Sequence, residues 1–104
     1  MQNMDPEEIA VKVKETIEKN PNRDYIQSIS LFGSFLHGMS RPNSDIDLLL
    51  EMRKTMSLFR LLSVKEQLEK SLGRKVDLVE KNSLIKQLKD KIIAESKKIY
   101  ERGS

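Results

Sequence analysis

Apolar residues recur at helical intervals near the start of the chain. Ile9, Val13 and Ile17 lie four residues apart and form a single stripe if the segment is a helix. The preceding pair Asp5-Pro6 supplies an N-cap and a proline suited to the first helical position. The segment Asn20-Pro21-Asn22 ends the pattern, because proline cannot continue a helix. The sequence therefore predicts a first helix between these two signals.

Three later segments have the apolar character of strands. In residues 25–32, Ile29 and Leu31 alternate with serines, which is typical of a half-buried strand. Residues 45–51 contain the longest apolar run, Ile46 with Leu48–Leu50, and are predicted to be the central strand. Residues 75–79 are predicted to form a third strand. The first strand ends at Gly33-Ser34, and a loop marked by Pro42 and Asn43 follows.

Two further helices complete the predicted fold. The second begins near Ser57 and ends at Gly73, where glycine favours a left-handed C-cap. The last runs from a cap at Asn82-Ser83 to Gly103. Their apolar residues are Leu58, Leu61, Leu62, Val64, Leu68 and Leu72 in the former, and Leu84, Ile85, Leu88, Ile92, Ile93, Ile99 and Tyr100 in the latter. The order predicts an α+β fold, a small mixed sheet flanked by helices, in a single domain over residues 1–104.

Composition narrows the class of protein. With 38% hydrophobic and 34% charged residues, the chain is expected to be soluble and globular. It has no Cys, which excludes disulfides and thiolate metal sites. No apolar run is long enough to span a bilayer, and the acidic N-terminus lacks a signal pattern. A cytoplasmic protein with no membrane partner is predicted.

The net charge of +3 is small, because 19 basic residues are nearly matched by 16 acidic ones. Basic residues become more frequent late in the chain, but Asp90, Glu95 and Glu101 interleave with them. Alternating signs on a helix indicate a solvated face more often than a nucleic-acid groove. Direct binding of nucleic acid is therefore not expected, although this segment stays a weaker alternative.

A pair of carboxylates opens the central strand. Asp45 and Asp47 are two residues apart, so in an extended strand both project from one face while Ile46, Leu48 and Leu50 point into the core. Adjacent carboxylates repel each other unless a cation or proton lies between them. Hard oxygen ligands favour Mg²⁺ or Mn²⁺. The pair therefore predicts a divalent metal site.

Gly33 and Ser34 precede this pair by a short loop. Glycine permits close approach of the backbone, and a helical turn beginning at Ser34 would offer a hydroxyl and unpaired amides to phosphate. A third carboxylate, Asp77, lies between apolar neighbours in the third strand. If that strand lies beside residues 45–50, Asp77 completes the site and accepts the proton of a nucleophile. A phosphate-binding turn facing metal-binding carboxylates is what phosphoryl or nucleotidyl transfer requires.

Each element also has a structural reading. Gly-Ser at a strand end is a common turn, and Ser44-Asp45 can cap local backbone groups. Asp77 can pair with a nearby cation: Arg74, Lys75 or Lys81. The conjunction of all three elements in this order favours the catalytic reading.

The segments Leu31–Gly38 and Asn43–Leu49 closely resemble the signature of the minimal nucleotidyltransferases, which belong to the DNA polymerase β-like superfamily. The resemblance continues through Leu72–Val79 and the last helix, and so covers nearly the whole chain. It implies the minimal polymerase-β-like nucleotidyltransferase fold. It also implies that Gly33 and Ser34 hold the triphosphate, with Asp45, Asp47 and Asp77 as catalytic and metal-binding residues.

One position departs from the family pattern. The family commonly carries Ala-Arg where this chain has Leu36-His37. Histidine is mostly neutral at pH 7, whereas arginine is a permanent cation. His37 is either a hydrogen-bond donor to phosphate or an ordinary loop residue, and Arg41 is a candidate substitute cation. Ser44, within the motif, completes the predicted nucleotide-binding set.

The resemblance predicts transfer of AMP, or another NMP, from an NTP to a protein hydroxyl, with ATP as donor and Mg²⁺ or Mn²⁺ as cofactor. Many such proteins act as antitoxins for a small helical HEPN toxin, which is the predicted partner. The alternative is a catalytically weak or inactive protein that neutralises a helical HEPN partner by contact alone. The acceptor and any homo-oligomer are left open by the sequence.

Overall fold

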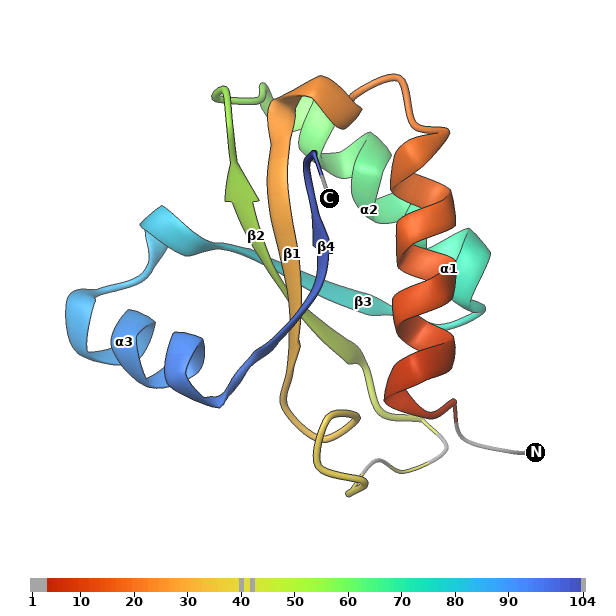
Figure 1. Cartoon of the computed structure of the whole chain (residues 1–104), viewed down its shortest axis with the longest axis vertical. Coiled ribbons are helices and arrows are strands. Elements are labelled where there is room, and N and C mark those ends of the chain that lie inside the picture. Colours follow the sequence, from red (N-terminus) through yellow and green to blue (C-terminus); the bar gives the residue numbers. More distant parts are fainter. Residues whose placement is uncertain (1–3, 40, 42, 104) are drawn as a thin grey trace.

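The computed structural model of the protein describes residues 4–39, 41 and 43–103. Within them, four strands form one sheet in the order β3-β2-β1-β4 (Figure 1). β1 is antiparallel to both β2 and β4, whereas β2 and β3 are parallel. The sheet is therefore mixed, as predicted. The strands are β1 (Ile26–Phe32), β2 (Ile46–Met52), β3 (Val76–Glu80) and β4 (Lys97–Glu101).

Helices lie on both sides of this sheet. Figure 1 shows α1 (Pro6–Glu18) and α2 (Leu58–Leu72) on one side and α3 (Lys86–Glu95) on the other. Two short 3-10 helices, η1 (Arg23–Tyr25) and η2 (Lys81–Ser83), precede β1 and α3. None of the helices in the described ranges is both long and apolar enough to cross a membrane.

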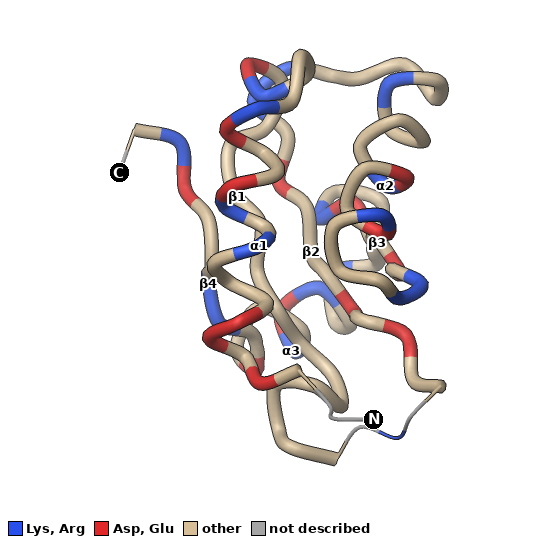
Figure 2. The backbone as a smooth tube through the Cα atoms, turned by 90° about the vertical axis from the view of Figure 1, so that its right-hand side faces the viewer, with Lys and Arg blue, Asp and Glu red and all other residues tan. Residues whose placement is uncertain are grey.

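The first helix forms as its sequence predicts. The Asp5 carboxylate accepts a hydrogen bond of 2.8 Å from the backbone N–H of Glu8, which satisfies one of the unpaired amides of the first turn. Ile9, Val13 and Ile17 are fully buried against the sheet. Basic and acidic positions interleave along the helix in Figure 2. One apolar stripe thus anchors α1 while its other faces remain charged.

The core lies between α1, α2 and one face of the sheet. From β2 it receives Ile46, Leu48 and Leu50, all fully buried, which confirms their predicted orientation. Gly73 ends α2 in the predicted left-handed conformation, with φ of 68°. The loop residue Pro42, used in the prediction, lies outside the described residues.

Only part of the predicted apolar side of α2 faces the core. Val64, Leu68 and Leu72 are buried, but Leu58 is 68% exposed and Leu62 is 43% exposed. Leu58 and Leu62 lie four residues apart and form a second stripe, rotated away from the first. The prediction was wrong for these two leucines, because the helix has two apolar stripes and the sheet can cover only one.

The last helix is shorter than predicted. α3 begins at Lys86 rather than after an Asn82-Ser83 cap, ends at Glu95, and has no buried residue. The segment Lys97–Glu101 forms β4, so the prediction that Ile99 and Tyr100 are helical was wrong. Pairing with β4 satisfies the backbone groups along an otherwise open edge of β1, and both apolar side chains pack against the core.

The sheet face away from α1 and α2 is here called the open face. Alternation along the strands places Ser28, Ser30 and Phe32 of β1 on it, beside Asp47, Leu49 and Glu51 of β2 and Asp77 and Val79 of β3. α3 borders this face without burying any residue of its own. The predicted site residues of β2 and β3 are therefore all on the open face.

Candidate active site

The strand register brings two of the predicted carboxylates side by side. Asp47 of β2 is paired with Asp77 of the parallel strand β3, and with Phe32 of β1 on its other side. Paired residues of adjacent strands project to the same face of a sheet. The expected position of Asp77 beside the Asp45–Asp47 strand is therefore confirmed, although the chemical roles of these residues stay predictions.

The three carboxylates influence one another electrostatically. Asp47 is half-buried, whereas Asp45 and Asp77 are exposed. Burial raises the pKa of Asp47 above its ordinary value, and the negative charges of Asp77 and Asp45 raise it further. A divalent cation placed between these groups would relieve the repulsion. The charge of the site is therefore suited to a metal ion.

Gly33 is in direct contact with this cluster. Its φ is +78°, in the region that favours glycine. A Cβ atom at this position would overlap the Asp47 carboxylate, so any larger residue would displace that carboxylate. Gly33 was predicted to let the backbone come close to another group, and in the structure that group is the Asp47 carboxylate.

The segment after Gly33 is a series of turns rather than a helix. The N–H of Leu36 donates to the Gly33 carbonyl at 3.2 Å, and the N–H of Met39 donates to the Ser34 carbonyl at 2.9 Å. The expectation of a helix N-terminus at Ser34 was therefore wrong. The turn is held by Phe35, which is buried in the core.

The loop leading to β2 has its own hydrogen bonds. The Ser44 hydroxyl accepts from the Arg41 N–H at 2.7 Å, and the Ser44 N–H donates to the Arg41 carbonyl at 2.9 Å. Ser44 thus shapes the loop just before Asp45. His37 and the Arg41 side chain are exposed, and no contact joins either of them to the carboxylates among the described residues.

Arg74 is a site residue that the sequence pattern did not single out for this role. Its guanidinium lies over the Phe35 ring, 5.1 Å from the centroid, and Nη1 is 3.5 Å from the carbonyl oxygens of both Arg41 and Ser44. It therefore ties the turn after Gly33 to the loop before Asp45. No spacing in the sequence could have indicated this, because the three segments meet only in the folded chain.

Arg74 also lines a hollow beside the carboxylates. The hollow has a volume of about 370 Å³, and Ser44, Asp45 and Lys75 contribute to it. The cationic residues Arg74 and Lys75 thus lie next to Asp45, a candidate metal ligand. Lys81, considered as a partner for Asp77, instead pairs with Glu51 at 3.7 Å, and none of the ion pairs among the described residues involves Asp77.

The carboxylates fit a divalent cation in chemistry and charge but are not closed around one point. Within residues 4–39, 41 and 43–103, no group of three or more His, Cys, Asp or Glu side chains is arranged to hold a metal ion. Their oxygens are hard ligands of the type that Mg²⁺ prefers. Binding would require the three carboxylates to turn toward a common position, which rotation of the exposed Asp45 and Asp77 side chains toward the half-buried Asp47 would allow.

Comparison with known proteins identifies the class. Residues 11–104 match the family model described as "Polymerase beta, Nucleotidyltransferase". A putative protein adenylyltransferase of Methanocaldococcus jannaschii is 38% identical over 71 residues, which cover 68% of this chain and 76% of that protein. The chain belongs to the polymerase β nucleotidyltransferase family and is a nucleotidyltransferase.

Solved structures agree with this assignment. A putative minimal nucleotidyltransferase superposes with a TM-score of 0.76 at 28% identity, covering 92% of this chain and 97% of that one. A toxin-antitoxin structure with AMP-PNP superposes with a TM-score of 0.70 at 26% identity, covering 94% of this chain and 75% of that one. The predicted minimal nucleotidyltransferase fold is confirmed.

Proposed function

We propose that this chain transfers AMP from ATP to a hydroxyl group of a partner protein. The observation that carries the proposal is the pairing of Asp47 with Asp77 next to Gly33. It is supported by the similarity to protein adenylyltransferases and to a structure with AMP-PNP. Transfer of another nucleoside monophosphate from its own triphosphate is the alternative outcome.

The carboxylates divide the chemistry between them. Asp45 and Asp47 would hold Mg²⁺ or Mn²⁺, which neutralises charge on the phosphates when bound. Asp77, exposed on the edge strand, takes the proton of the acceptor hydroxyl. The acceptor oxygen then forms a bond to the α-phosphorus of ATP, the bond from that phosphorus to the bridging oxygen breaks, and pyrophosphate leaves.

The triphosphate is assigned to the turn beside these residues. The backbone at Gly33 and Ser34 can approach phosphate closely, and Ser44 shapes the loop before Asp45 through its bond to Arg41. His37 and Arg41 are exposed and near in sequence, so either can donate to the outer phosphates. Because histidine replaces the common arginine, we expect ATP affinity below that of arginine-containing relatives.

The partner is proposed to be a helical HEPN toxin, with this chain as its antitoxin, in the cytoplasm. The support is the family resemblance together with the likeness to a toxin-antitoxin structure. Exposed apolar side chains such as Phe59, 84% exposed, offer surface for such a partner.

Labelled ATP tests the proposal directly. The chain and its helical partner are incubated with ATP labelled at the α-phosphate and Mg²⁺, and the adduct is located by mass spectrometry. Asp45→Asn and Asp47→Asn are expected to abolish transfer, while Asp90→Asn on the exposed side of α3 retains it. Transfer that persists in both active-site variants would reject the proposal.

A second function is neutralisation of the partner by contact alone. It is favoured by the carboxylates not being closed around a metal position. In that case Asp45→Asn would neutralise the partner as well as the wild type does, at a fixed stoichiometry. Neutralisation that depends on ATP and on Asp45 would exclude it.

A further inference from the structure

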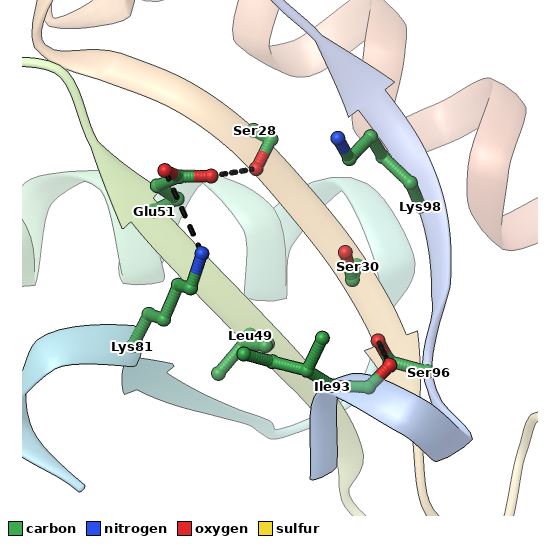
Figure 3. Close-up of a pocket in the computed structure, with 8 residues that line it drawn as sticks. All are labelled: Ser28, Ser30, Leu49, Glu51, Lys81, Ile93, Ser96 and Lys98. Atoms are coloured by element: carbon green, nitrogen blue, oxygen red, sulfur yellow. Dashed lines mark hydrogen bonds and ion pairs between the residues drawn. The ribbon is translucent and has the colours of Figure 1, made fainter. Parts of the chain in front are cut away.

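A small pocket lies on the open face beside α3. Its volume is about 250 Å³, and Figure 3 shows the side chains around it. Ser30 of β1 and Leu49 of β2 line it from the sheet, and Lys98 of β4 stands at one side. Ile93 and Ser96, at the end of α3, close it from the other direction. The pocket therefore has both apolar and hydrogen-bonding surface.

The pocket adjoins the carboxylates along the strands. Ser30 is paired with Leu49, and the next pair on the same face is Phe32 with Asp47. Side chains two residues apart on a strand are separated by about 7 Å. The pocket thus begins one side-chain repeat from Asp47, on the side opposite Gly33. A molecule bound at the turn and the carboxylates reaches it by extending along the sheet.

The Ser30 hydroxyl marks the pocket as a binding site. Ser30 is only 7% exposed, and this hydroxyl makes no hydrogen bond to another described residue. Ser28, by contrast, donates to Glu51 at 3.2 Å, and Glu51 also pairs with Lys81 (Figure 3). The Ser30 oxygen is not sealed from solvent, because no fully buried side-chain nitrogen or oxygen of the described residues lacks a partner. The Ser30 hydroxyl is therefore available to an occupant of the pocket.

We propose that this pocket binds the nucleoside part, ribose and base, of the nucleotide donor. The inference rests on the proposed function for the position of the phosphates. Leu49 and Ile93 offer apolar contact to the face of a base, and the Ser30 hydroxyl and Lys98 ammonium offer polar contact to its edge or to the sugar. The chain thus supplies its own contacts to the nucleoside.

The position of Asp77 indicates that the acceptor binds on the β3 side of the site. It lies on β3, the edge strand, and is exposed. An acceptor hydroxyl that gives its proton to Asp77 must lie over β3. The β1 side of the carboxylates, where Ser30 lies, is then left for the nucleoside.

Two pocket variants and one control test this assignment. Ile93→Trp fills the pocket from α3, and Ser30→Ala removes the hydroxyl with little change in volume. Leu88→Trp is the matched control, because Leu88 is on the same helix and exposed but outside the pocket. Calorimetry measures the Kd of each variant for ATP and for inorganic tripolyphosphate with Mg²⁺, and circular dichroism checks that each is folded.

We expect Ile93→Trp to weaken ATP binding about tenfold or more, and Ser30→Ala about fivefold through loss of one hydrogen bond. Tripolyphosphate binding stays unchanged in both, and Leu88→Trp changes neither ligand. Unchanged ATP affinity in both pocket variants overturns the inference, whether or not the KM for the protein acceptor rises. Absence of ATP binding by the wild type also overturns it. Selective loss of ATP affinity without any AMP transfer by the wild type supports the pocket and rejects only the proposed function.

Discussion

The Asp47 carboxylate occupies the space that a side chain at residue 33 would need, so Asp47 can keep this position only with glycine at residue 33. Gly33→Ala therefore has two effects. The left-handed φ of +78° costs about 1–2 kcal/mol of folding free energy for a non-glycine residue. In addition, the new methyl group displaces Asp47, and we expect AMP transfer to fall by about tenfold or more.

Gly38→Ala is the control for this variant. Its φ of +70° imposes a similar backbone cost, but nothing lies within 4 Å of the new methyl group. Chemical denaturation should show a stability loss in both variants, at least as large in Gly33→Ala because its methyl group also meets Asp47, and label transfer should show an activity loss confined to Gly33→Ala. Equal transfer activities of Gly33→Ala and Gly38→Ala would contradict the contact between residue 33 and Asp47.

Asp47 is expected to destabilise the metal-free protein at neutral pH. Its folded pKa lies above the ordinary value of 3.8, because of burial and the charges of Asp77 and Asp45. Between those two pKa values the folded state binds more protons than the unfolded state, so stability falls as pH rises through that window. Asp47→Asn should therefore be more stable than the wild type at pH 7, measured by thermal unfolding in EDTA.

The stability difference between Asp47→Asn and the wild type should disappear as the pH falls below 3.8, because the Asp47 carboxylate is then protonated in both the folded and the unfolded state. Asp77→Asn should also reduce the pH dependence, since it removes one of the charges acting on Asp47. Identical pH profiles for the wild type and Asp47→Asn would show that the carboxylate is not perturbed.

Arg74 is expected to hold the two loops of the site together. Arg74→Ala removes the contact with Phe35 and the bonds to two loop carbonyls, and we expect a loss of about 1–2 kcal/mol. Arg74→Lys keeps the charge without the planar guanidinium and should recover little. Hydrogen exchange at the Ser44 amide, bonded to Arg41, reports the loosening. Full recovery by lysine would indicate a role for charge alone.

Two leucines of α2 form a matched pair for the core. Leu68 is fully buried, so Leu68→Ala should destabilise the protein by about 2–5 kcal/mol. Leu62→Ala, at a largely exposed position, should change stability by no more than about 0.5 kcal/mol. Urea denaturation separates the two cases. Comparable losses would mean that the Leu62 stripe is also buried, for example in an oligomer.

Sequence reasoning succeeded where local chemistry decides the structure. The Asp5 cap, the stripe from Ile9 to Ile17 and the left-handed Gly73 each depend on neighbours within one helical turn. The inward orientation of Ile46, Leu48 and Leu50 follows from the alternation of a strand. These features needed no knowledge of the tertiary fold.

The errors arose where distant segments decide the structure. Residues 97–101 have an ambiguous apolar pattern, and they become a strand because β1 offers an unpaired edge. The turn at Ser34 is shaped by burial of Phe35, and Arg74 joins the site through that ring and the carbonyls of Arg41 and Ser44. Local propensity carries no information about such contacts.

The open face also has a consequence for when the reaction can occur. One wall of the site is a sheet surface with exposed carboxylates, and the described residues include no segment that covers Asp77. Solvent can therefore reach a nucleotide held there, and water weakens the electrostatic forces that would activate it. A protein that binds over this surface would both present its hydroxyl and exclude water from the site. Binding of the acceptor protein would thus also activate AMP transfer, and the chain alone would hydrolyse little ATP.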